Sequence, residues 1–357
     1  MRRRQSIAGG AVRRWEHRGK ARRGEDVPGN RAMRRHRRGL CGFAFALALA
    51  ASIAAACGTP SSSHSGASGP EKTHITVGVL PIIDCAAFYI AQRDGLFKQQ
   101  GLDATPLVLA NGALGIQLLV PGRLDFAFNN YVTAVQTASH GTSLRVVADG
   151  HEAPPGNTVI VVPRNSPLRA PQDLRGKTIA VNALQNIGPL LVGATLARYG
   201  VPRTAVKIVA IPFPQMVGAM ANHTVDAAWM TEPFLTQAEK KYGARALADT
   251  SSGPTANFPI AGWQTTPRFA QQNPKTVAAF QRAIDKAQAL ANKPGEVAQV
   301  LPGYVKGVTP QLASQLNLGS FPAAPVTPAR LQRVSALMQA QGMLRKPFDA
   351  RQLLAGG

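Results

Sequence analysis

Segments typical of strands and of helices alternate along the chain from residue 74 onward, and this alternation limits the fold more than any other feature. Residues 75–80 combine β-branched and small side chains and are followed by Pro81, which indicates a strand that ends in a loop. Further strands are predicted at 102–109, 125–128 and 144–148, separated by helices at 86–94, 113–120 and 131–140. This order predicts an α/β fold with a mostly parallel sheet that is covered on both faces.

A second alternation follows the apolar segment at residues 159–163 and predicts a second, smaller sheet. Its strands are predicted at 178–181, 206–210 and 225–229, and its helices at 188–199, 214–221 and 232–241. One more extended segment at 258–265 precedes helices at 274–291, 309–318 and 327–341. Since these last helices bring no strands of their own, they are expected to pack on the first sheet.

The body of the chain is longer than one hydrophobic core usually organises, so two lobes are expected. We assign residues 74–165 to lobe 1, residues 166–256 to lobe 2, and residues 257–357 to a return to lobe 1 with C-terminal helices. The two crossings are predicted at residues 164–168 and 251–257, because both stretches are rich in Pro, Gly and Ser and suit a hinge.

Residues 1–56 have the layout of an export signal. A basic run at 34–38 precedes an apolar segment that is shorter than the about 20 residues of a membrane span, and small residues precede Cys57. The segment resembles the lipobox of bacterial lipoproteins, whose cysteine is lipidated, although Ala54 stands where those boxes usually carry Leu. A retained transmembrane anchor is the alternative. Translation begins at Met1 or at Met33, and in the second case residues 1–32 are a mis-annotated extension.

After the signal, the chain is expected to begin with a flexible tether and to carry a positive charge. Residues 57–73 are rich in Gly and Ser and form the predicted tether. Residues 1–56 hold 14 of the 40 Lys and Arg and 3 of the 18 acidic residues, so the rest has 26 basic and 15 acidic residues and a net charge of +11. This charge suits an anionic ligand or the adjacent lipid surface. Nucleic acid is excluded as a partner, because an exported protein meets none and the basic residues are scattered.

Short motifs stand in a fixed order along the body of the chain. They are VLPIIDCAAFYIA at 79–91, DGLF at 94–97, GRLDFA at 122–127, DLRGK at 173–177, VDAA at 225–228 and EPF at 232–234. In this order they resemble the periplasmic binding proteins for nitrate, alkanesulfonates, taurine and thiamine-pyrimidine precursors, over residues 74–345. The resemblance implies a type II periplasmic-binding-protein fold, with two lobes of mixed, mostly parallel sheet joined by a two-segment hinge.

The same resemblance implies a function. Together with the lipobox-like segment before Cys57, it predicts a monomeric, lipid-anchored receptor on the extracytoplasmic face of the cell membrane. Such a receptor captures a small molecule by closing its two lobes and delivers the molecule to the permease subunits of an ABC importer.

In open α/β sheets a ligand binds beyond the carboxyl ends of the strands, so the candidate ligand-binding residues are those that follow predicted strands. They are Asp84, Phe88, Tyr89, Asn129, Asn130 and Tyr131 in lobe 1, and Asn182, Asn186, Trp229 and Glu232 in lobe 2. At least one of the aromatic pair at 88 and 89 belongs to the core, and Trp229 is expected to form a wall of the cleft.

Two of these candidates keep alternative interpretations. Asp84 either binds an amine or amide of the ligand or caps the following helix. Glu232 either binds the ligand or provides a favourable negative charge at the start of its helix. Aromatic and carboxylate side chains suit a nitrogenous or planar solute better than an oxyanion, which prefers Arg, Lys and backbone amides. The resemblance nevertheless includes oxyanion binders, so both ligand classes remain open.

The sequence contains no motif that indicates catalysis or a metal. It has no H-E-x-x-H pair, no G-x-S-x-G turn and no P-loop. Relatives that synthesise the thiamine pyrimidine carry a cysteine-rich motif and a cofactor lysine, and this chain has only the single Cys85 in its body. We therefore predict no enzyme activity, no cofactor and no metal. The alternative is an exported enzyme or sensor module that uses the same fold.

Overall fold

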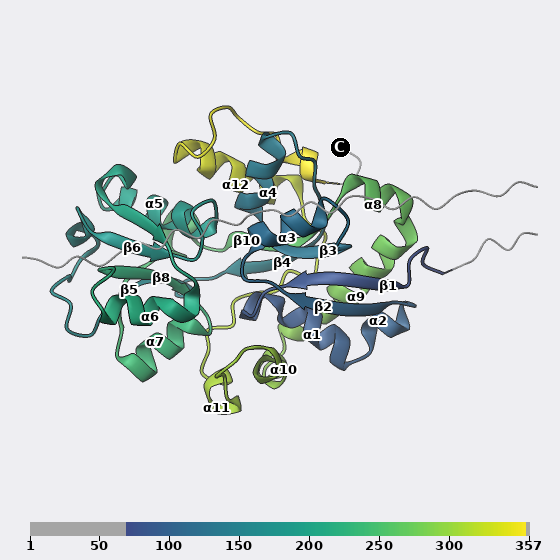
Figure 1. Ribbon diagram of the computed structural model, residues 1–357, viewed down its shortest axis with the longest axis horizontal. Coiled ribbons are helices and arrows are strands. Elements are labelled where there is room, and N and C mark those ends of the chain that lie inside the picture. Colours follow the sequence, from purple (N-terminus) through teal and green to yellow (C-terminus); the bar gives the residue numbers. More distant parts are fainter. Residues whose placement is uncertain (1–68, 355–357) are drawn as a thin grey trace, which may run out of the picture. The chain divides into compact units, whose positions relative to one another are not determined.

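The computed structural model describes residues 69–354, which form two five-stranded sheets (Figure 1). Sheet A has the order β2-β1-β3-β10-β4 and contains β1 (His74–Val79), β2 (Asp103–Val108), β3 (Phe126–Asn130), β4 (Arg145–Ala153) and β10 (Phe258–Thr265). Sheet B has the order β7-β6-β8-β5-β9 and contains β5 (Thr158–Val162), β6 (Thr178–Val181), β7 (Lys207–Ala210), β8 (Ala227–Thr231) and β9 (Arg245–Asp249). The prediction that the second sheet is smaller is wrong in strand number. We call sheet A with its helices lobe 1, and sheet B with its helices lobe 2.

The two sheets share one topology. β1 pairs in parallel with β2 and β3, and β6 pairs in parallel with β7 and β8. β10 runs antiparallel to β3 and β4, and β5 runs antiparallel to β8 and β9. Each antiparallel strand enters its sheet directly after the chain has crossed from the other lobe, and every residue of both strands is buried. Each crossing therefore leads from an edge strand of one sheet, β4 or β9, to an interior strand of the other, β5 or β10.

The first crossing lies earlier than the sequence predicts. Strand β5 pairs with β8 and β9 in sheet B, so the chain changes sheets at residues 154–157 and not at 164–168. The turn contains Pro154, Pro155 and Gly156, whose φ of 79° is a conformation that glycine adopts without strain. An apolar strand carries no sign of which sheet it joins, and this explains the error. The second crossing, at residues 250–257, lies where it was expected.

Helices follow most strands, and their bounds agree well with the sequence pattern for the long ones. The predicted helix at 274–291 coincides with α9. The helices are α1 (Ala86–Arg93), α2 (Leu96–Gln99), α3 (Gly112–Leu119), α4 (Tyr131–Ser139), α5 (Ile187–Arg198), α6 (Phe213–Ala221), α7 (Phe234–Tyr242), α8 (Pro267–Gln272), α9 (Pro274–Ala291), α10 (Glu296–Tyr304), α11 (Pro310–Ala313) and α12 (Pro328–Ala340). Short 3₁₀ turns are η1 (Ile83–Cys85), η2 (Pro171–Leu174), η3 (Arg203–Ala205), η4 (Gly253–Thr255) and η5 (Ala350–Leu353).

Some elements escaped the sequence analysis. Helix α10 contains Pro302, a residue that usually argues against a helix interior. Strand β9 has the sequence RALAD, which lacks the β-branched and aromatic residues that favour strands. The short helix α8 was not predicted, and of the predicted helix at 309–318 only α11 forms.

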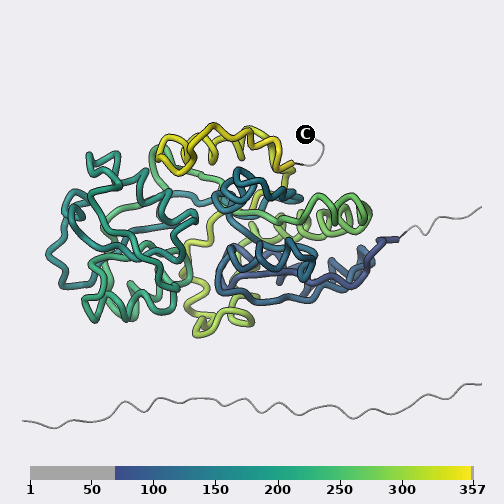
Figure 2. Tube along the Cα trace, turned by 45° about the horizontal axis from the view of Figure 1, so that its top comes forward, coloured from purple at the N-terminus to yellow at the C-terminus, as the bar shows by residue number. Residues whose placement is uncertain are grey.

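The C-terminal helices pack on lobe 1, as predicted. Helix α9 contacts α1, α2 and β4, helix α10 contacts α1, and α12 contacts α4 and β10 (Figure 2). The aromatic core of lobe 1 includes α9, because Phe280 stacks on Phe126 with 4.0 Å between ring centroids and meets Trp263 edge to face. The C-terminal segment is therefore part of lobe 1, and it also contacts lobe 2 through α12 and α5 and through the Asn317 amide and Glu232.

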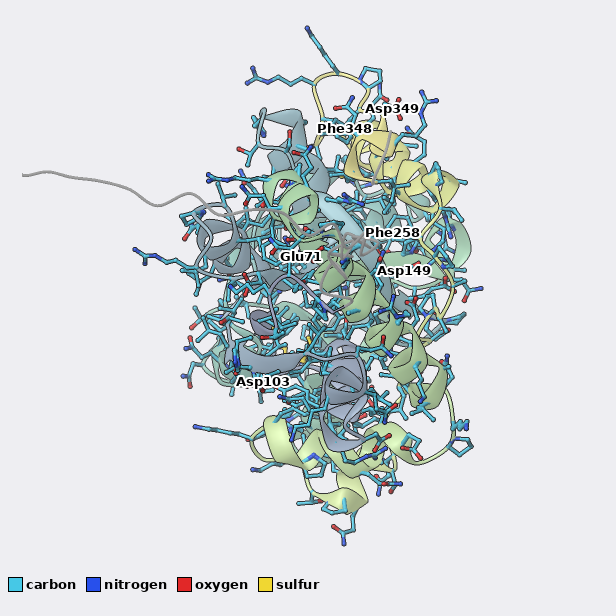
Figure 3. The ribbon with its side chains drawn as sticks, turned by 90° about the vertical axis from the view of Figure 1, so that its right-hand side faces the viewer. Glu71, Asp103, Asp149, Phe258, Phe348 and Asp349 are labelled. Atoms are coloured by element: carbon cyan, nitrogen blue, oxygen red, sulfur yellow. The ribbon has the colours of Figure 1, made fainter. Side chains whose placement is uncertain are left out.

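Helix α12 also holds the end of β4 in place. Arg330 Nε lies 2.7 Å from Asp149 Oδ2, and its Nη1 lies 2.6 Å from Glu152 Oε2. Asp149 is buried. After α12 the chain folds back along this helix, and Figure 3 shows Phe348 and Asp349 beside it. These ion pairs fix the stretch of β4 that leads into the first crossing.

The predicted export signal, Cys57 and the tether up to residue 68 lie outside the described residues. Among residues 69–354 no helix is both long and apolar enough to cross a membrane. Within the same residues no group of three His, Cys, Asp or Glu side chains could hold a metal ion. Cys85 is buried and unpaired in this part of the chain.

Candidate functional site

A pocket lies between the lobes, at the carboxyl ends of strands from both sheets, and we call it the interlobe pocket. Its cavity volume is about 40 Å³, several times the space that one water needs. Its aromatic walls are Phe128 from lobe 1 and Phe213 and Trp229 from lobe 2. Its polar side chains are Asp84, Asn130 and His151 from lobe 1, Asn157 from the first crossing, and Thr158, Asn182, Asn186 and Thr231 from lobe 2.

Asp84 and His151 form the ionisable part of the pocket. Asp84 lies in η1 directly after β1, and its Oδ2 is 3.4 Å from Nδ1 of His151 on β4. His151 Nε2 lies 3.2 Å from the Leu318 carbonyl oxygen. Because a carbonyl oxygen only accepts, Nε2 carries a hydrogen, and Nδ1 is left to face the carboxylate. Nδ1 has no hydrogen-bond partner among residues 69–354, so its contact with the carboxylate is electrostatic.

Burial sets the charge balance of this pair. Asp84 is 5% exposed and His151 is 1% exposed. Burial raises the pKa of the Asp84 carboxyl, and the neighbouring His151 opposes that shift. The alternative interpretation of Asp84 as a helix cap is wrong, because neither η1 nor α1 has a side-chain cap in the structure.

Asn130 and Asn186 line the pocket as helix caps. Asn130 Oδ1 accepts a hydrogen bond of 2.9 Å from the Thr133 amide at the start of α4, and its Nδ2 donates to Thr133 Oγ1. Asn186 Oδ1 accepts from the Ile187 amide at the start of α5. Each cap satisfies a backbone amide at the start of its helix. Thr133 Oγ1 also lies 2.9 Å from the Gln185 carbonyl oxygen, which links α4 of lobe 1 to lobe 2.

Trp229 belongs both to the wall of the pocket and to the core of lobe 2. Its side chain is only 2% exposed, and its Nε1 donates a hydrogen bond of 2.9 Å to Thr250 Oγ1. Phe213 lies beside it with 5.9 Å between ring centroids. On the helix side, a Cβ added to Gly188 would lie 2.9 Å from the indole ring. The indole is therefore held rigidly, which suits a wall that contacts a flat solute.

Several polar atoms of the pocket residues have no partner. Within residues 69–354 no group donates a hydrogen bond to Asp84 Oδ1, Asn157 Oδ1 or Asn182 Oδ1, although all three are buried. We call these atoms the three unpaired oxygens. Asn157 Nδ2 donates to the Asn317 carbonyl oxygen at 2.7 Å, which fixes the orientation of that amide. Buried polar atoms are almost always paired in folded proteins, so unpaired ones in a pocket indicate where a ligand binds.

The structure brings together five of the ten residues that the sequence singled out. These are Asp84, Asn130, Asn182, Asn186 and Trp229, which all line the interlobe pocket.

The other five lie outside the pocket lining. Phe88 packs in the core against Phe97 and Trp263, and Tyr89 stacks on Tyr304 with 3.8 Å between centroids. Asn129 is buried in β3, and Tyr131 donates to Asp149. Glu232 accepts from the Thr236 amide in the first turn of α7 and from the Asn317 amide, in keeping with its helix-start interpretation. Burial raises the pKa of Glu232, and the hydrogen bonds from Thr236 oppose the shift.

Some pocket residues escaped the sequence analysis for two reasons. The predicted strand at 144–148 ended too early, since β4 continues to Ala153 and carries His151 inside it. Asn157 belongs to the first crossing and Thr158 begins β5 directly after it, and this crossing was placed too late. The pair of prolines followed by glycine at 154–156 is the signal that could have located the end of β4 and the first crossing.

Comparison with solved structures defines the fold class. The chain superposes on the alkanesulfonate-binding protein SsuA from Xanthomonas axonopodis pv. citri with a TM-score of 0.67 and 21% identity, covering 80% of this chain and 99% of that one. The fold is that of the periplasmic binding proteins, as expected, with two mixed sheets. Residues 82–297 match the family described as NMT1/THI5 like, and the chain belongs to this family.

Two curated relatives are similar in sequence. A putative binding protein of Brucella abortus is 27% identical over 211 residues, which are 56% of this chain and 60% of the relative. The nitrate/nitrite binding protein NrtA of Synechococcus elongatus is 25% identical over 296 residues, which are 71% of this chain and 65% of that protein. The chain thus spans about 60% of the length of the Brucella relative.

Proposed function

We propose that this protein is a solute receptor of an ABC import system. The observation that carries the proposal is the interlobe pocket, which is lined by both lobes and contains buried polar atoms that lack partners in residues 69–354. Pockets at the carboxyl ends of strands are the usual ligand sites of α/β folds. The names of the relatives, which are binding proteins, support the same class of function.

The receptor works by a shift between open and closed states. The ligand touches residues of both lobes, so it favours the closed state by the difference between its affinities for the two states. The segments 154–157 and 250–257 are the two connections about which the lobes move. The closed form then docks on the permease of the importer, which releases the solute into the translocation path.

The proposal places the protein outside the cytoplasm. Export through residues 1–56, lipidation at Cys57 and a tether at residues 57–73 would hold a monomeric receptor at the outer face of the cell membrane. The support for this part is the sequence pattern alone. The receptor acts by binding, without catalysis, a cofactor or a metal.

Cross-linking in the producing cell tests the receptor role. A photoreactive amino acid placed at Leu184, an exposed residue of lobe 2 close to Asn182 and Asn186, should label the permease subunits of an ABC importer. A matched exposed position, Lys98 on α2, should give much weaker labelling, because α2 lies at the end of lobe 1 away from lobe 2 (Figure 1). Labelling that includes no importer subunit at either position would contradict the proposal.

A further inference from the structure

Four buried polar atoms of the interlobe pocket lack a partner among residues 69–354, namely His151 Nδ1 and three side-chain oxygens. Asp84 Oδ1, Asn157 Oδ1 and Asn182 Oδ1 are hydrogen-bond acceptors, and none has a donor in the described part of the chain. Asp84 and Asn157 are 5% and 0% exposed. A carboxylate can only accept, and the Asn157 amide is oriented by its bond to the Asn317 carbonyl. A ligand that completes these atoms must bring donors.

Three of the donors that line the pocket are already used within the protein. Trp229 Nε1 donates to Thr250, Asn130 Nδ2 to Thr133, and Asn157 Nδ2 to Asn317. Among the described residues that line the pocket, there is neither a Lys nor an Arg. An oxyanion brings only acceptors, and it would find no cationic Lys or Arg side chain among these lining residues.

The charge of the pocket also disfavours an anion. The residues that face Asp84 are His151 from β4, Tyr304 from α10 and its neighbour Cys85. His151 carries one proton on Nε2. With one further proton on either side chain the Asp84–His151 pair is neutral, and without it the pair is negative. In neither state does the pair attract an anion.

The remaining lining sets the shape of the ligand. Phe128, Phe213 and Trp229 provide three aromatic walls, and the indole is held by Thr250 and Gly188. Aromatic faces favour flat and cationic groups over tetrahedral anions. The reachable space of about 40 Å³ limits the ligand to a small solute.

We propose that the solute carries a planar group with several N–H donors, of the amidine or guanidine class, and that Asp84 is the residue that selects it. The three unpaired oxygens accept its N–H groups, and the aromatic walls contact its faces. Nitrate and sulfonates, which the names of relatives mention, are rejected by this pocket. The inference rests on the proposed function, since it names the ligand of the same site.

The test is calorimetric titration of the chain with named solutes. The probes are guanidinium, methylguanidinium, acetamidinium and benzamidinium on one side, and nitrate, sulfate, taurine and methanesulfonate on the other, all at constant ionic strength. We expect at least one probe of the first group to bind with one-to-one stoichiometry and more tightly than any probe of the second group. Tighter binding of an oxyanion, or binding of neither group by a chain that unfolds cooperatively, would overturn the inference. The cross-linking experiment above decides the receptor role separately.

Two variants test the selecting residue. Asp84→Asn keeps the shape and removes the charge, and it should weaken binding of the best probe by about 100-fold. The matched control is Asp103→Asn on β2, an exposed carboxylate of the same lobe, which should bind like the wild type. If Asp84→Asn does not fold, Asn182→Ser, at the less buried end of the set, should still reduce affinity by about 5-fold. If a folded Asp84→Asn or, failing that, Asn182→Ser binds the best probe as tightly as the wild type does, the role assigned to these oxygens is overturned.

Discussion

The two lobes have the same strand order but contribute different chemistry to the pocket between them. Lobe 1 supplies the ionisable groups Asp84 and His151, whereas lobe 2 supplies two of the three aromatic walls and no charged side chain among the described lining residues. Topology alone therefore decides where the pocket lies, and the residues at the strand ends decide what it can bind.

The aromatic half of the pocket (Phe213 and Trp229 of lobe 2) and the ionisable half (Asp84 and His151 of lobe 1) also differ in their effect on the stability of the unliganded protein. Trp229 of lobe 2 is packed and hydrogen-bonded within its own core, so the same side chain serves the fold and the pocket. Asp84 of lobe 1 is buried with one oxygen that lacks a donor in residues 69–354, which opposes folding. The aromatic half should therefore stabilise the unliganded protein, and the ionisable half should destabilise it.

The largest expected effect is on the aromatic half. Trp229→Ala should lower the free energy of unfolding by about 3–5 kcal/mol, because it removes a buried indole and leaves a cavity. Urea denaturation of the unliganded protein measures this change. Trp263→Ala, which removes a fully buried indole of lobe 1 outside the pocket, is the matched control with a loss of similar size. A loss below about 1 kcal/mol for Trp229→Ala would show that the indole is a wall and not part of the core.

Crowding against the same indole should produce a smaller effect. In Gly188→Ala the added Cβ meets the Trp229 ring at 2.9 Å, so the ring or the first turn of α5 must move. We expect a loss of about 2 kcal/mol in unfolding free energy together with weaker ligand binding. Gly218→Ala in α6, where no atom lies within 4 Å of the added Cβ, is the control and should leave both unchanged or slightly improved. Normal ligand affinity in Gly188→Ala would show that the ring position does not matter for binding.

The same contrast explains how much of the molecule could be predicted from the sequence. Strand and helix alternation predicts β1, β3 and α9 well, because hydrophobic period and local propensity agree there. It could not predict that β5 belongs to sheet B, since a fully apolar strand is equally suitable for either sheet.

The site was predicted only where strands end as expected. Asp84, Asn182 and Trp229 follow or end predicted strands and line the pocket, whereas His151 lies inside a strand that runs five residues beyond its predicted end at Ala148. Phe88 and Tyr131 show the opposite error, because their helix faces point to the core of lobe 1, where they contact Trp263 and Asp149. Which face of a helix is buried depends on the elements packed against it, and one sequence does not show that.

The ionisable half should respond in the opposite direction. Asp84→Asn should raise the unfolding free energy of the unliganded protein by about 1–2 kcal/mol near neutral pH, because it removes a buried charge with an unsatisfied oxygen. The pKa of Asp84 is raised in the folded state, so the wild type binds this proton more tightly when folded. Its stability therefore falls as pH rises above the unfolded-state value of about 4, until the folded-state pKa is passed.

Denaturation curves at several pH values measure that difference. The gap in unfolding free energy between Asp84→Asn and wild type should widen as pH rises through this interval and should become small below it. Asp103→Asn, at an exposed site, should show no such widening. If Asp84→Asn is less stable than wild type at neutral pH, the carboxylate is satisfied by His151 and the contrast between the two halves fails.

The smallest expected effect concerns one hydrogen bond between the two lobes. Thr133 Oγ1 of α4 lies 2.9 Å from the Gln185 carbonyl oxygen of lobe 2, so it bonds only when the lobes are close. Thr133→Val should weaken ligand affinity by about 5-fold, which corresponds to one hydrogen bond of about 1 kcal/mol. Ser139→Ala, which removes a hydroxyl bonded to Gln136 within the same helix, is the control and should bind normally. Small-angle scattering in solution should then show a larger open fraction for Thr133→Val than for the wild type. Equal open fractions would mean that any change in affinity comes from the altered contact with the Asn130 cap and not from lobe closure.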